Sequence, residues 1–502
     1  MVDKDDKKID QQQEPVNLEE VESDKPNQGN VVFKTEIVPE ELPEEEVAPE
    51  DLSPQNFPES DAGAPIQPDT PQESKKTTYL VVVGMIILFL VIFFTILKFL
   101  GFFGGAPAKK ITLEYWGLWE DESIMSPLIA DYRRKNPNIE IKYSKRDPQN
   151  YREKLLARSR EGRGPDIFRY HSTWIPTIKE VLSPIPGKLM SNQQFEKTFY
   201  SLAAKDLKVD KFYYAIPLEI DGLVLIYNND LFKKAGIELP PKSWEDIIDY
   251  ASRLTVKNVD SLVTSGIALG TANNIEHFSE ILGWMLLQNG AELEKLTEQA
   301  AVDTLEQYRR FAEPPDNTWD ENMPNSISAF IQGKVAMVFA PSWQIITIKS
   351  ANPDLDVKVV PLPKVPGGTD VAISNYWVEG VSKFSKNQFE AWRFLVFLAD
   401  KENMTKLYSE EAKTRLFGEP YSRIDLKDKL SQNEYIGSVL QQADRMKTLP
   451  LVARTYDNGL NDEVVKYLEN AVNATSQGVS YREAFTTASR GILQTFSKYG
   501  IK

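Results

Sequence analysis

The pattern of apolar and polar positions divides the chain into three stretches. Polar residues dominate the first 76 positions, where residues 31–33 form one short apolar cluster. Nineteen uncharged residues follow, from Tyr79 to Leu97. From Ile111 onward, apolar residues recur with the periods of strands and helices.

In the third stretch, predicted strands alternate with predicted helices. The strands are expected at residues 111–116, 139–143, 166–168, 223–227, 335–339 and 356–360. The helices are expected at residues 126–135, 151–160, 244–254, 389–398 and 462–472. This alternation predicts an α/β fold with a mainly parallel sheet.

The uncharged run from Tyr79 to Leu97 is long enough to cross a hydrocarbon core of roughly 30 Å as a helix. A secretory signal is the closest rival, because residues 106–108 (Ala-Pro-Ala) imitate a cleavage site. The run is longer than the apolar core of a secretory signal. The segment that precedes it is also far too long for the N-terminal part of such a signal. We therefore expect an uncleaved transmembrane helix within residues 77–103, followed by a linker at 104–110.

The net charge of −15 is concentrated at the N-terminus. Residues 1–76 hold 21 acidic and 7 basic side chains, together with 10 of the 31 prolines. Such a segment buries too little apolar area to offset its ordering entropy, so we expect a disordered spacer. A partner-binding tail is the alternative. The other 426 residues hold 52 acidic and 51 basic side chains and are close to neutral.

Composition excludes several classes of site. The chain has no cysteine, so disulfides, thiolate metal sites and cysteine nucleophiles are excluded. It has only two histidines, so a metal site built from several histidines is excluded. Nucleic-acid binding requires a basic face, and the acidic balance argues against it. We expect no cofactor, no metal and no catalytic residues.

Ligands of open α/β sheets bind beyond the ends of the strands, which selects candidate positions. These are Trp116, Trp119, Glu120 and Asp121 after the first strand, Tyr170 and Trp174 after the third, Asp221 before the strand at 223–227, Trp343 after 335–339, and Asn375, Tyr376 and Trp377 after a short strand at 371–373.

Aromatic rings, carboxylates and amides together are typical of a sugar site. The rings cover the C–H faces of a sugar, and the polar groups bind its hydroxyls. A tryptophan at a strand end is nevertheless often part of the core, and His171 is expected to be structural. A glycosidase using Glu219 with Asp221, or Glu120 with Asp121, is the enzymatic alternative.

Seven sequence motifs resemble, in order, those of the bacterial extracellular solute-binding proteins of ABC importers, the family that includes maltose-binding protein. They are residues 111–116, Tyr132 with 136–139 (Asn-Pro-Asn-Ile), 164–168 (Gly-Pro-Asp-Ile-Phe), 214–217 with 225–232, 234–237 with 240–246, 333–337 with 341–343, and 391–395. Two features depart from the family pattern. The lipid-modified cysteine is absent, and Ser374–Trp377 replaces a common glycine pair.

The resemblance implies two lobes, joined by a hinge, that close on a carbohydrate. Lobe 1 would hold about 111–217 and 366–425, and lobe 2 about 220–361 and 430–502. Hinge crossings would fall near 217–220 and 361–366. Among the candidates, Trp343, Asp221, Tyr170 and Glu120 occupy positions where the family contacts ligand.

The resemblance also implies a partner and a location. The partner would be the permease of an ABC transporter, and the solute-binding domain would be extracellular. The N-terminal tail would then be cytoplasmic and the chain a single-pass protein of the cell membrane. A sensor or adhesion receptor that signals through the acidic tail is the alternative.

Overall fold

A computed structural model describes residues 75–99, 110–259 and 261–501. The expected acidic tail and most of the expected linker lie outside the described residues. The helix α1 and the α/β part that follows it are considered separately below.

Helix α1 covers Lys75–Phe99. Its apolar side chains from Tyr79 to Ile96 are exposed, so the helix buries no face. By length and composition, residues 79–98 suffice to cross a membrane, and no other helix in the described ranges does. The helix begins two residues before the expected range, and residues 100–103 of that range are not described.

The first lobe is built on a four-stranded sheet with the order β12-β3-β1-β2. Its strands are β1 (Ile111–Gly117), β2 (Ile139–Lys145), β3 (Ile167–His171) and β12 (Trp377–Val381). Strand β1 runs parallel to β2 and β3, whereas β12 runs antiparallel to β3. The expectation of a mainly parallel sheet is therefore confirmed here.

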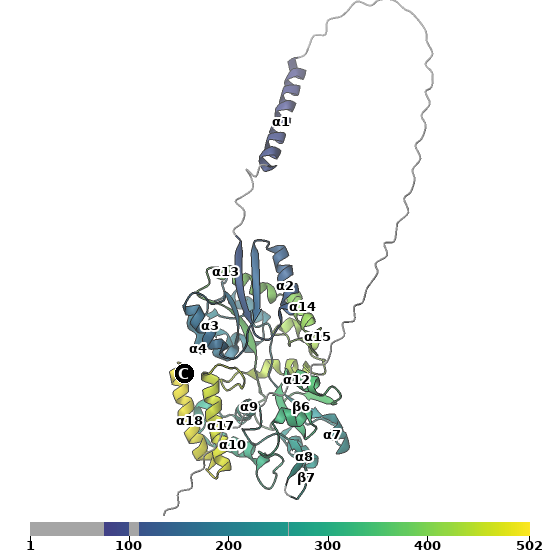
Figure 1. Cartoon of the computed structure of the whole chain (residues 1–502), viewed down its shortest axis with the longest axis vertical. Helices are drawn as coiled ribbons and strands as arrows, with labels where there is room; N and C mark the ends of the chain where they lie inside the picture. Colours follow the sequence, from purple (N-terminus) through teal and green to yellow (C-terminus); the bar gives the residue numbers. More distant parts are fainter. Residues whose placement is uncertain (1–74, 100–109, 260, 502) are drawn as a thin grey trace, which may run out of the picture. The chain divides into compact units, whose positions relative to one another are not determined.

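The main helices of the first lobe pack around this sheet (Figure 1). They are α2 (Glu122–Lys135), α3 (Tyr151–Arg160), α13 (Gln388–Leu398) and α14 (Lys401–Glu411). The chain between β3 and the second sheet forms α4 (Ile175–Ile178), α5 (Asn192–Thr198), α6 (Ser201–Asp206), β4 (Lys208–Val209) and β5 (Phe212–Tyr213).

The second lobe is built on a five-stranded sheet with the order β10-β6-β9-β8-β7. Its strands are β6 (Leu223–Asn228), β7 (Val256–Lys257), β8 (Leu262–Ile267), β9 (Val335–Pro341) and β10 (Val357–Val360). Only β8 and β9 pair in parallel. The expectation of a mainly parallel sheet is wrong here, because β6 enters from the first lobe at Leu223, opposite the residue where β9 ends.

Helices surround the second sheet (Figure 1). They are α7 (Asn229–Lys234), α8 (Trp244–Leu254), α9 (Phe278–Gln288), α10 (Gln299–Arg309), α11 (Ser326–Ile331), α12 (Gln344–Ala351), α16 (Gly437–Gln442), α17 (Leu460–Ser476) and α18 (Tyr481–Lys498). The ring of Trp284 on α9 stacks on that of Trp244 on α8 and packs at a tilt against Phe339 of β9.

Three segments carry the chain between the lobes, and they bond to one another. The first crossing is residues 217–222. The second is residues 372–376 and begins with β11 (Ala372–Ile373), which pairs with β13 (Met446–Lys447). The third begins at residues 419–421 and continues through α15 (Lys427–Leu430). Backbone bonds join Ile220 to Pro420 and Asn375 to Asp221.

The local predictions of strands and helices agree with the structure apart from their ends. Helix α3 has the expected bounds, whereas α2 begins four residues earlier than expected. The second crossing also comes later than 361–366, because Lys364 and Thr369 still bond to residues of α8 and α9 or beside them.

Candidate ligand-binding cleft

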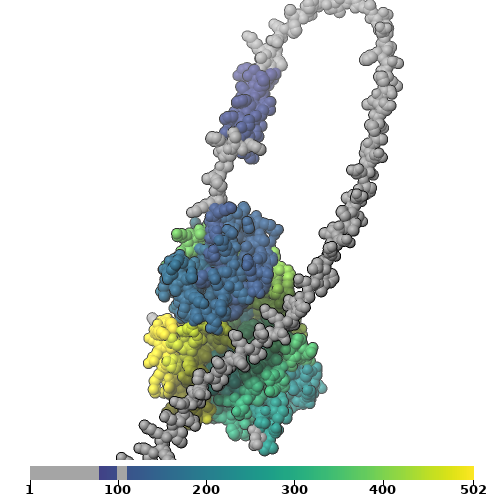
Figure 2. All heavy atoms as spheres, in the orientation of Figure 1, coloured from purple at the N-terminus to yellow at the C-terminus, as the bar shows by residue number. Residues whose placement is uncertain are grey.

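A cleft of about 300 Å³ lies between the two lobes, and all three crossings contribute to its wall. Figure 2 shows the first lobe, largely in blue, against the second lobe in teal to yellow. The cleft is lined by Trp119, Glu219, Asp221, Ser342, Trp343, Ile346, Thr347, Asn375, Trp377, Arg415, Phe417, Gly418, Glu419, Pro420, Ala453, Arg454 and Tyr456. Five of the eleven predicted site residues are among them.

Tryptophans reach the cleft from both lobes. Trp119 follows β1 and meets Trp377, the first residue of β12, edge to face with ring centroids 5.3 Å apart. Trp343 comes from the second lobe, in the turn between β9 and α12, and packs edge-on against His277 at 5.7 Å. Opposed rings of this kind offer apolar faces to a ligand that enters between the lobes.

The carboxyl group of Asp221 is held by backbone N–H groups from its own segment and from the turn after β9. Its Oδ1 accepts the N–H groups of Gly222 at 2.7 Å and Ser342 at 3.1 Å. Its Oδ2 accepts the N–H of Trp343 at 3.2 Å. Burial raises the pKa of Asp221 to about 7, while these donors favour the carboxylate. The carboxyl thus joins the first crossing to the turn that carries Trp343.

Glu219 lies two residues earlier and also lines the cleft. Its Oε1 accepts the N–H of Trp377 at 2.9 Å, and Glu419 lines the same cleft. Burial, reinforced by the negative charge of Glu419, raises the pKa of Glu219 well above its usual value. Glu219 therefore links the first crossing to Trp377, which directly follows the second crossing, and through its bridge to Tyr421 to the third.

Arg169 lies behind this wall and is only 2% exposed. Its guanidinium forms ion pairs with Glu120 from the β1–α2 turn and with Glu379 of β12. A longer contact of 3.5 Å reaches Glu419. Arg169 is the central residue of its strand and points away from water, so the carboxylates replace its lost hydration.

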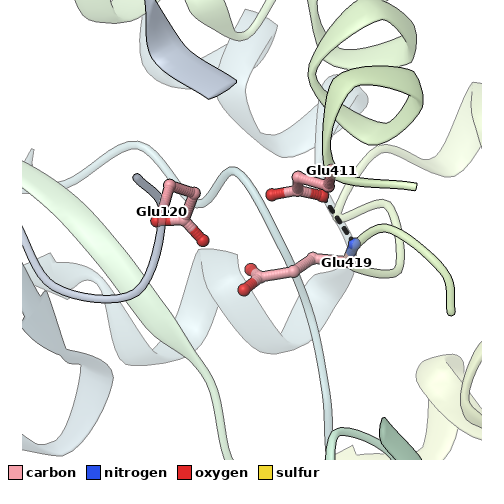
Figure 3. A group of neighbouring side chains, drawn as sticks. All are labelled: Glu120, Glu411 and Glu419. Carbon is pink, nitrogen blue, oxygen red and sulfur yellow. Dashed lines mark hydrogen bonds between the residues drawn. The ribbon is translucent and has the colours of Figure 1, made fainter. Parts of the chain in front are cut away.

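Figure 3 shows Glu120, Glu411 and Glu419 approaching one another. One carboxylate oxygen from each lies within 4.8 Å of the others. Glu120 and Glu419 are also partners of Arg169, as described above. The backbone N–H of Glu419 donates to Glu411 at 2.8 Å, and Arg415 contacts both of these glutamates. The guanidinium groups of Arg169 and Arg415 thus supply positive charge beside these three carboxylates.

The buried cluster holds more acid than base. It consists of Glu120, Glu219, Glu379, Glu411 and Glu419 with Arg169 and Arg415. Burial raises the pKa of Glu379 to about 7 and that of Glu411 to about 8. The pKa of Glu419 is lowered to about 2: burial opposes the shift, and the charges of Arg169 and Arg415, together with hydrogen bonding from neighbouring groups, outweigh it. Several protons are therefore retained by the cluster near neutral pH.

Three predicted site residues lie in the core behind the cleft. Tyr170 is fully buried, and its hydroxyl donates to the carbonyl of Tyr214. Trp174 is fully buried and supports Trp377 edge to face at 5.5 Å. Tyr376 donates its hydroxyl to Asp206, in the short helix α6. None of the three lines the cleft, and their side chains fill space between elements.

Three other predicted residues lie near the end of β1 or directly after it. Trp116 lies beneath the guanidinium of Arg146, 4.3 Å from the ring centroid. Glu120 is buried against Arg169, and Asp121 is exposed and pairs with Lys145 at 2.8 Å. The turn after β1 thus presents only Trp119 to the cleft, because its neighbours point into the protein or to solvent.

His171 has the structural role expected of it. Its Nε2 contacts the amide oxygen of Asn375 at 3.2 Å, and its Nδ1 contacts Thr173. Burial lowers the pKa of His171 to about 4, so the ring is neutral at physiological pH. The histidine thereby orients Asn375, whose side chain lines the cleft.

Sequence reasoning missed two cleft segments, residues 415–420 and 453–456. Both belong to irregular loops, after α14 and before α17, where no strand end signals a site. Arg454 and Tyr456 have left-handed backbones, with φ of 60° and 55°. Non-glycine residues rarely adopt this conformation. The sequence pattern therefore gives no signal that these two residues would do so.

The fold and the cleft define a two-lobe α/β ligand-binding protein. Residues 116–405 match the family described as bacterial extracellular solute-binding protein. The chain therefore belongs to this family.

Individual relatives are distant. The chain is 25% identical over 358 residues to the sn-glycerol-3-phosphate-binding periplasmic protein of Escherichia coli K12, covering 62% of this chain and 75% of the relative. It is 24% identical over 303 residues to a maltotriose-binding protein of Pyrococcus abyssi, covering 56% and 61%. The sugar-binding protein of Xanthomonas citri has a similar structure, with a TM-score of 0.64 at 18% identity, covering 77% of this chain and 98% of that one.

Proposed function

We propose that this protein is the substrate-binding component of an ABC importer and binds a sugar or short oligosaccharide between its lobes. Helix α1 would anchor it in the cell membrane, with the acidic tail at 1–76 in the cytoplasm and the two lobes outside. Its partner would be the permease of that importer. The observation that carries the proposal is the arrangement of Trp119, Trp377 and Trp343 on opposite walls of the cleft.

The chemistry of the cleft supports an uncharged, hydroxylated solute. Aromatic faces alternate with the amide of Asn375 and the carboxyl groups of Glu219 and Glu419. Amides and carboxyl groups bind hydroxyls, and a buried polar group left without its hydroxyl partner would penalise other ligands. Relatives named for binding maltotriose and sugars agree with this choice.

A phosphorylated solute is a poorer match, although one relative is named for binding sn-glycerol-3-phosphate. The cleft contains two arginines, and each is already paired. Arg415 contacts Glu411 and Glu419, and Arg454 contacts Glu276 at 2.8 Å. A phosphate would have to compete with these carboxylates for its counter-charge.

Under this proposal the cleft holds its solute without changing it. A glycosidase needs one carboxyl group free to donate a proton and a second free to attack or activate water. Asp221 is engaged by three backbone N–H groups, and Glu120 by Arg169. Closure about the three crossings would trap the solute, and the solute would favour closure only through tighter binding to the closed state.

A thermal-shift screen of the full chain in detergent tests the proposal. A neutral sugar at 100 times its dissociation constant should add about 2.7 kcal/mol of stability. The screen includes maltose, maltotriose, other oligosaccharides, glycerol-3-phosphate and short peptides. A shift with peptides or glycerol-3-phosphate, and none with any sugar, would refute the assignment of a neutral sugar.

The absence of cysteine allows a direct test of topology. Ser23→Cys places a single thiol in the tail, and Ser476→Cys places one on an exposed position at the end of α17. In intact cells a membrane-impermeant maleimide should label only the Ser476→Cys protein. Labelling of the tail thiol, with protection of the other, would reverse the proposed orientation.

A further inference from the structure

Asn375 lines the cleft from the second crossing, and other side chains engage both ends of its amide group. Its Oδ1 lies 3.2 Å from Nε2 of His171, and its Nδ2 lies 3.5 Å from Oε1 of Glu280 on α9. An amide accepts at one end and donates at the other, so its orientation determines what it presents to a solute. That orientation depends on which nitrogen of His171 carries the proton.

A neighbouring backbone group assigns the proton of His171. The N–H of Thr173 donates to Nδ1 of His171 at 3.3 Å, and a backbone N–H can only donate. Nδ1 is therefore the unprotonated nitrogen, and the single ring proton lies on Nε2. Because Nε2 donates, the oxygen of Asn375 must point at the ring and the nitrogen of Asn375 must point away from it.

A side chain of the second lobe completes this chain of donors. Nδ2 of Asn461, on α17, donates to Oγ1 of Thr173 at 2.7 Å, and that Oγ1 lies 2.8 Å from Nδ1 of His171. The amide of Asn461 is itself held, because its Oδ1 accepts the N–H of Val452 at 3.1 Å. The hydroxyl of Thr173 thus accepts from Asn461 and gives its own hydrogen to His171. Hydrogen bonds run in one direction from Asn461 to Asn375.

The other histidine has the opposite arrangement. Nε2 of His277 lies 3.1 Å from Nε2 of Gln344, and that Gln344 nitrogen also donates to Glu276 at 2.6 Å. Because an amide nitrogen only donates, Nε2 of His277 is the acceptor and the ring proton lies on Nδ1. Nδ1 of His277 then donates to Oε1 of Glu280 at 3.0 Å. Glu280 therefore accepts hydrogen bonds from both His277 and Asn375.

We propose that Asn375 determines specificity as a hydrogen-bond donor, presenting an amide N–H rather than its carbonyl oxygen to an acceptor oxygen of the solute. Its nitrogen carries two hydrogens, and Glu280 takes one of them. His171, Thr173 and Asn461 are positioning residues that hold the amide in this orientation. The inference rests on the proposed function, because it concerns the solute between the lobes. It adds the requirement for a hydroxyl, ring or glycosidic oxygen opposite Asn375.

Solid-state NMR of the natural chain tests the two proton assignments. The chain has only two histidines, so ring labelling with carbon-13 and nitrogen-15 gives two sets of signals. The full chain is reconstituted in phosphatidylcholine vesicles at pH 7. Nitrogen shifts separate protonated from unprotonated ring nitrogens. We expect one ring protonated on Nε2 and one on Nδ1, and His171→Gln should remove the first set. Two rings protonated on the same atom, or loss of the second set, would overturn the proposal.

Substitutions at Thr173 test the positioning residues. Thr173→Val keeps the shape of the side chain and removes its hydroxyl, so the Nδ1 signal of His171 should move. Thr173→Ser retains the hydroxyl and should restore the signal of the natural chain. An Nδ1 signal in Thr173→Val identical to that of the natural chain would exclude the hydroxyl from the chain of donors.

The sign of one affinity change tests the donor role itself. The probe is the sugar with the largest thermal shift among maltose, maltotriose and mannobiose, and calorimetry gives its dissociation constant. Asn375→Asp keeps the size of the side chain, but an ionised carboxylate only accepts. Binding should weaken at least about tenfold if Asn375 donates. Equal or tighter binding would overturn the donor role. Asn322→Asp makes the same change at an exposed residue outside the cleft and should leave the constant unchanged.

The two experiments separate this inference from the proposed function. The predicted ring protonation without binding of any sugar would refute the proposed function and, with it, the acceptor requirement, while the orientation of Asn375 would stand. Sugar binding with both rings protonated on the same atom would refute the orientation and leave the proposed function intact.

Discussion

Asp221 accepts the backbone N–H of Trp343 at 3.2 Å, so a carboxyl group of the first crossing positions a cleft tryptophan of the second lobe. Its other oxygen accepts the N–H of Ser342 in the same turn. The residue chosen from the sequence as a ligand contact thus also has a positioning role. The turn after β9 depends on a residue more than a hundred positions earlier.

Asp221→Asn should destabilise the protein by about 1–3 kcal/mol at pH 8, because the new amide presents donors where backbone N–H groups need acceptors. Urea unfolding followed by tryptophan fluorescence measures the change. Asp303→Asn, on the exposed face of α10, is the control and should leave the unfolding midpoint unchanged. Equal midpoints for the two variants would remove the positioning role.

Gly222→Ala should destabilise the crossings by about 1–3 kcal/mol through overpacking. A Cβ at this position would lie 2.2 Å from the carbonyl oxygen of Ile373, in the second crossing. Gly187→Ala is the matched control, because a Cβ there meets nothing within 4 Å. Thermal unfolding compares the two, and equal melting temperatures would contradict the close approach.

Trp343→Ala should weaken the sugar identified by the thermal-shift screen by about 1–3 kcal/mol, through lost aromatic burial. Calorimetry on the purified chain gives the dissociation constant. Phe212→Ala removes an exposed ring of β5, which does not line the cleft, and should leave the constant unchanged. Unchanged affinity in Trp343→Ala would exclude this ring from the binding site.

Arg169→Met should cost about 3–5 kcal/mol, because it leaves buried carboxylates without their counter-charge. The variant's unfolding midpoint and soluble yield report the loss. Adding Glu379→Gln should recover part of the stability, since one uncompensated charge is then removed. Arg134→Met, on the surface of α2, is expected to have no measurable effect. A stable Arg169→Met protein would show that the cluster does not depend on this guanidinium.

Between pH 6.5 and pH 8, the free energy of unfolding should fall as the pH rises, by about 1–3 kcal/mol. Burial raises the pKa of Glu379 to about 7 and that of Glu411 to about 8. The folded state therefore binds protons that the unfolded chain has already released. His171, with a pKa lowered to about 4, is neutral in the native state throughout this range. Urea unfolding at four pH values checks the sign, and rising stability would contradict it.

Local patterns predicted much of the secondary structure. The alternation at 111–116 and 139–143 indicated β1 and β2, and the apolar spacing of 151–160 indicated α3. These signals are local, because side chains alternate faces in a strand and repeat every three to four residues in a helix. The direction of pairing between β6 and β9 had no such signal and was predicted wrongly.

The candidate site was only partly accessible to the same reasoning. Trp119, Trp343 and Trp377 flank strands and could be selected by position. Tyr170 and Trp174 satisfied the same rule but lie in the core, because a strand end does not specify which way its side chains point. The loops at 415–420 and 453–456 reach the cleft only because the chain returns to it after long excursions.

The sequence by itself determined the order of elements, the apolar helix, the concentration of charge at the N-terminus and the family. Each depends on composition or on residues close together in the chain. Only the tertiary structure placed Arg169 beside Glu120, Glu379 and Glu419, and Arg415 beside Glu411 and Glu419. Those contacts join distant segments, and their energetics arise from burial away from water, which exists only once the lobes and crossings have assembled.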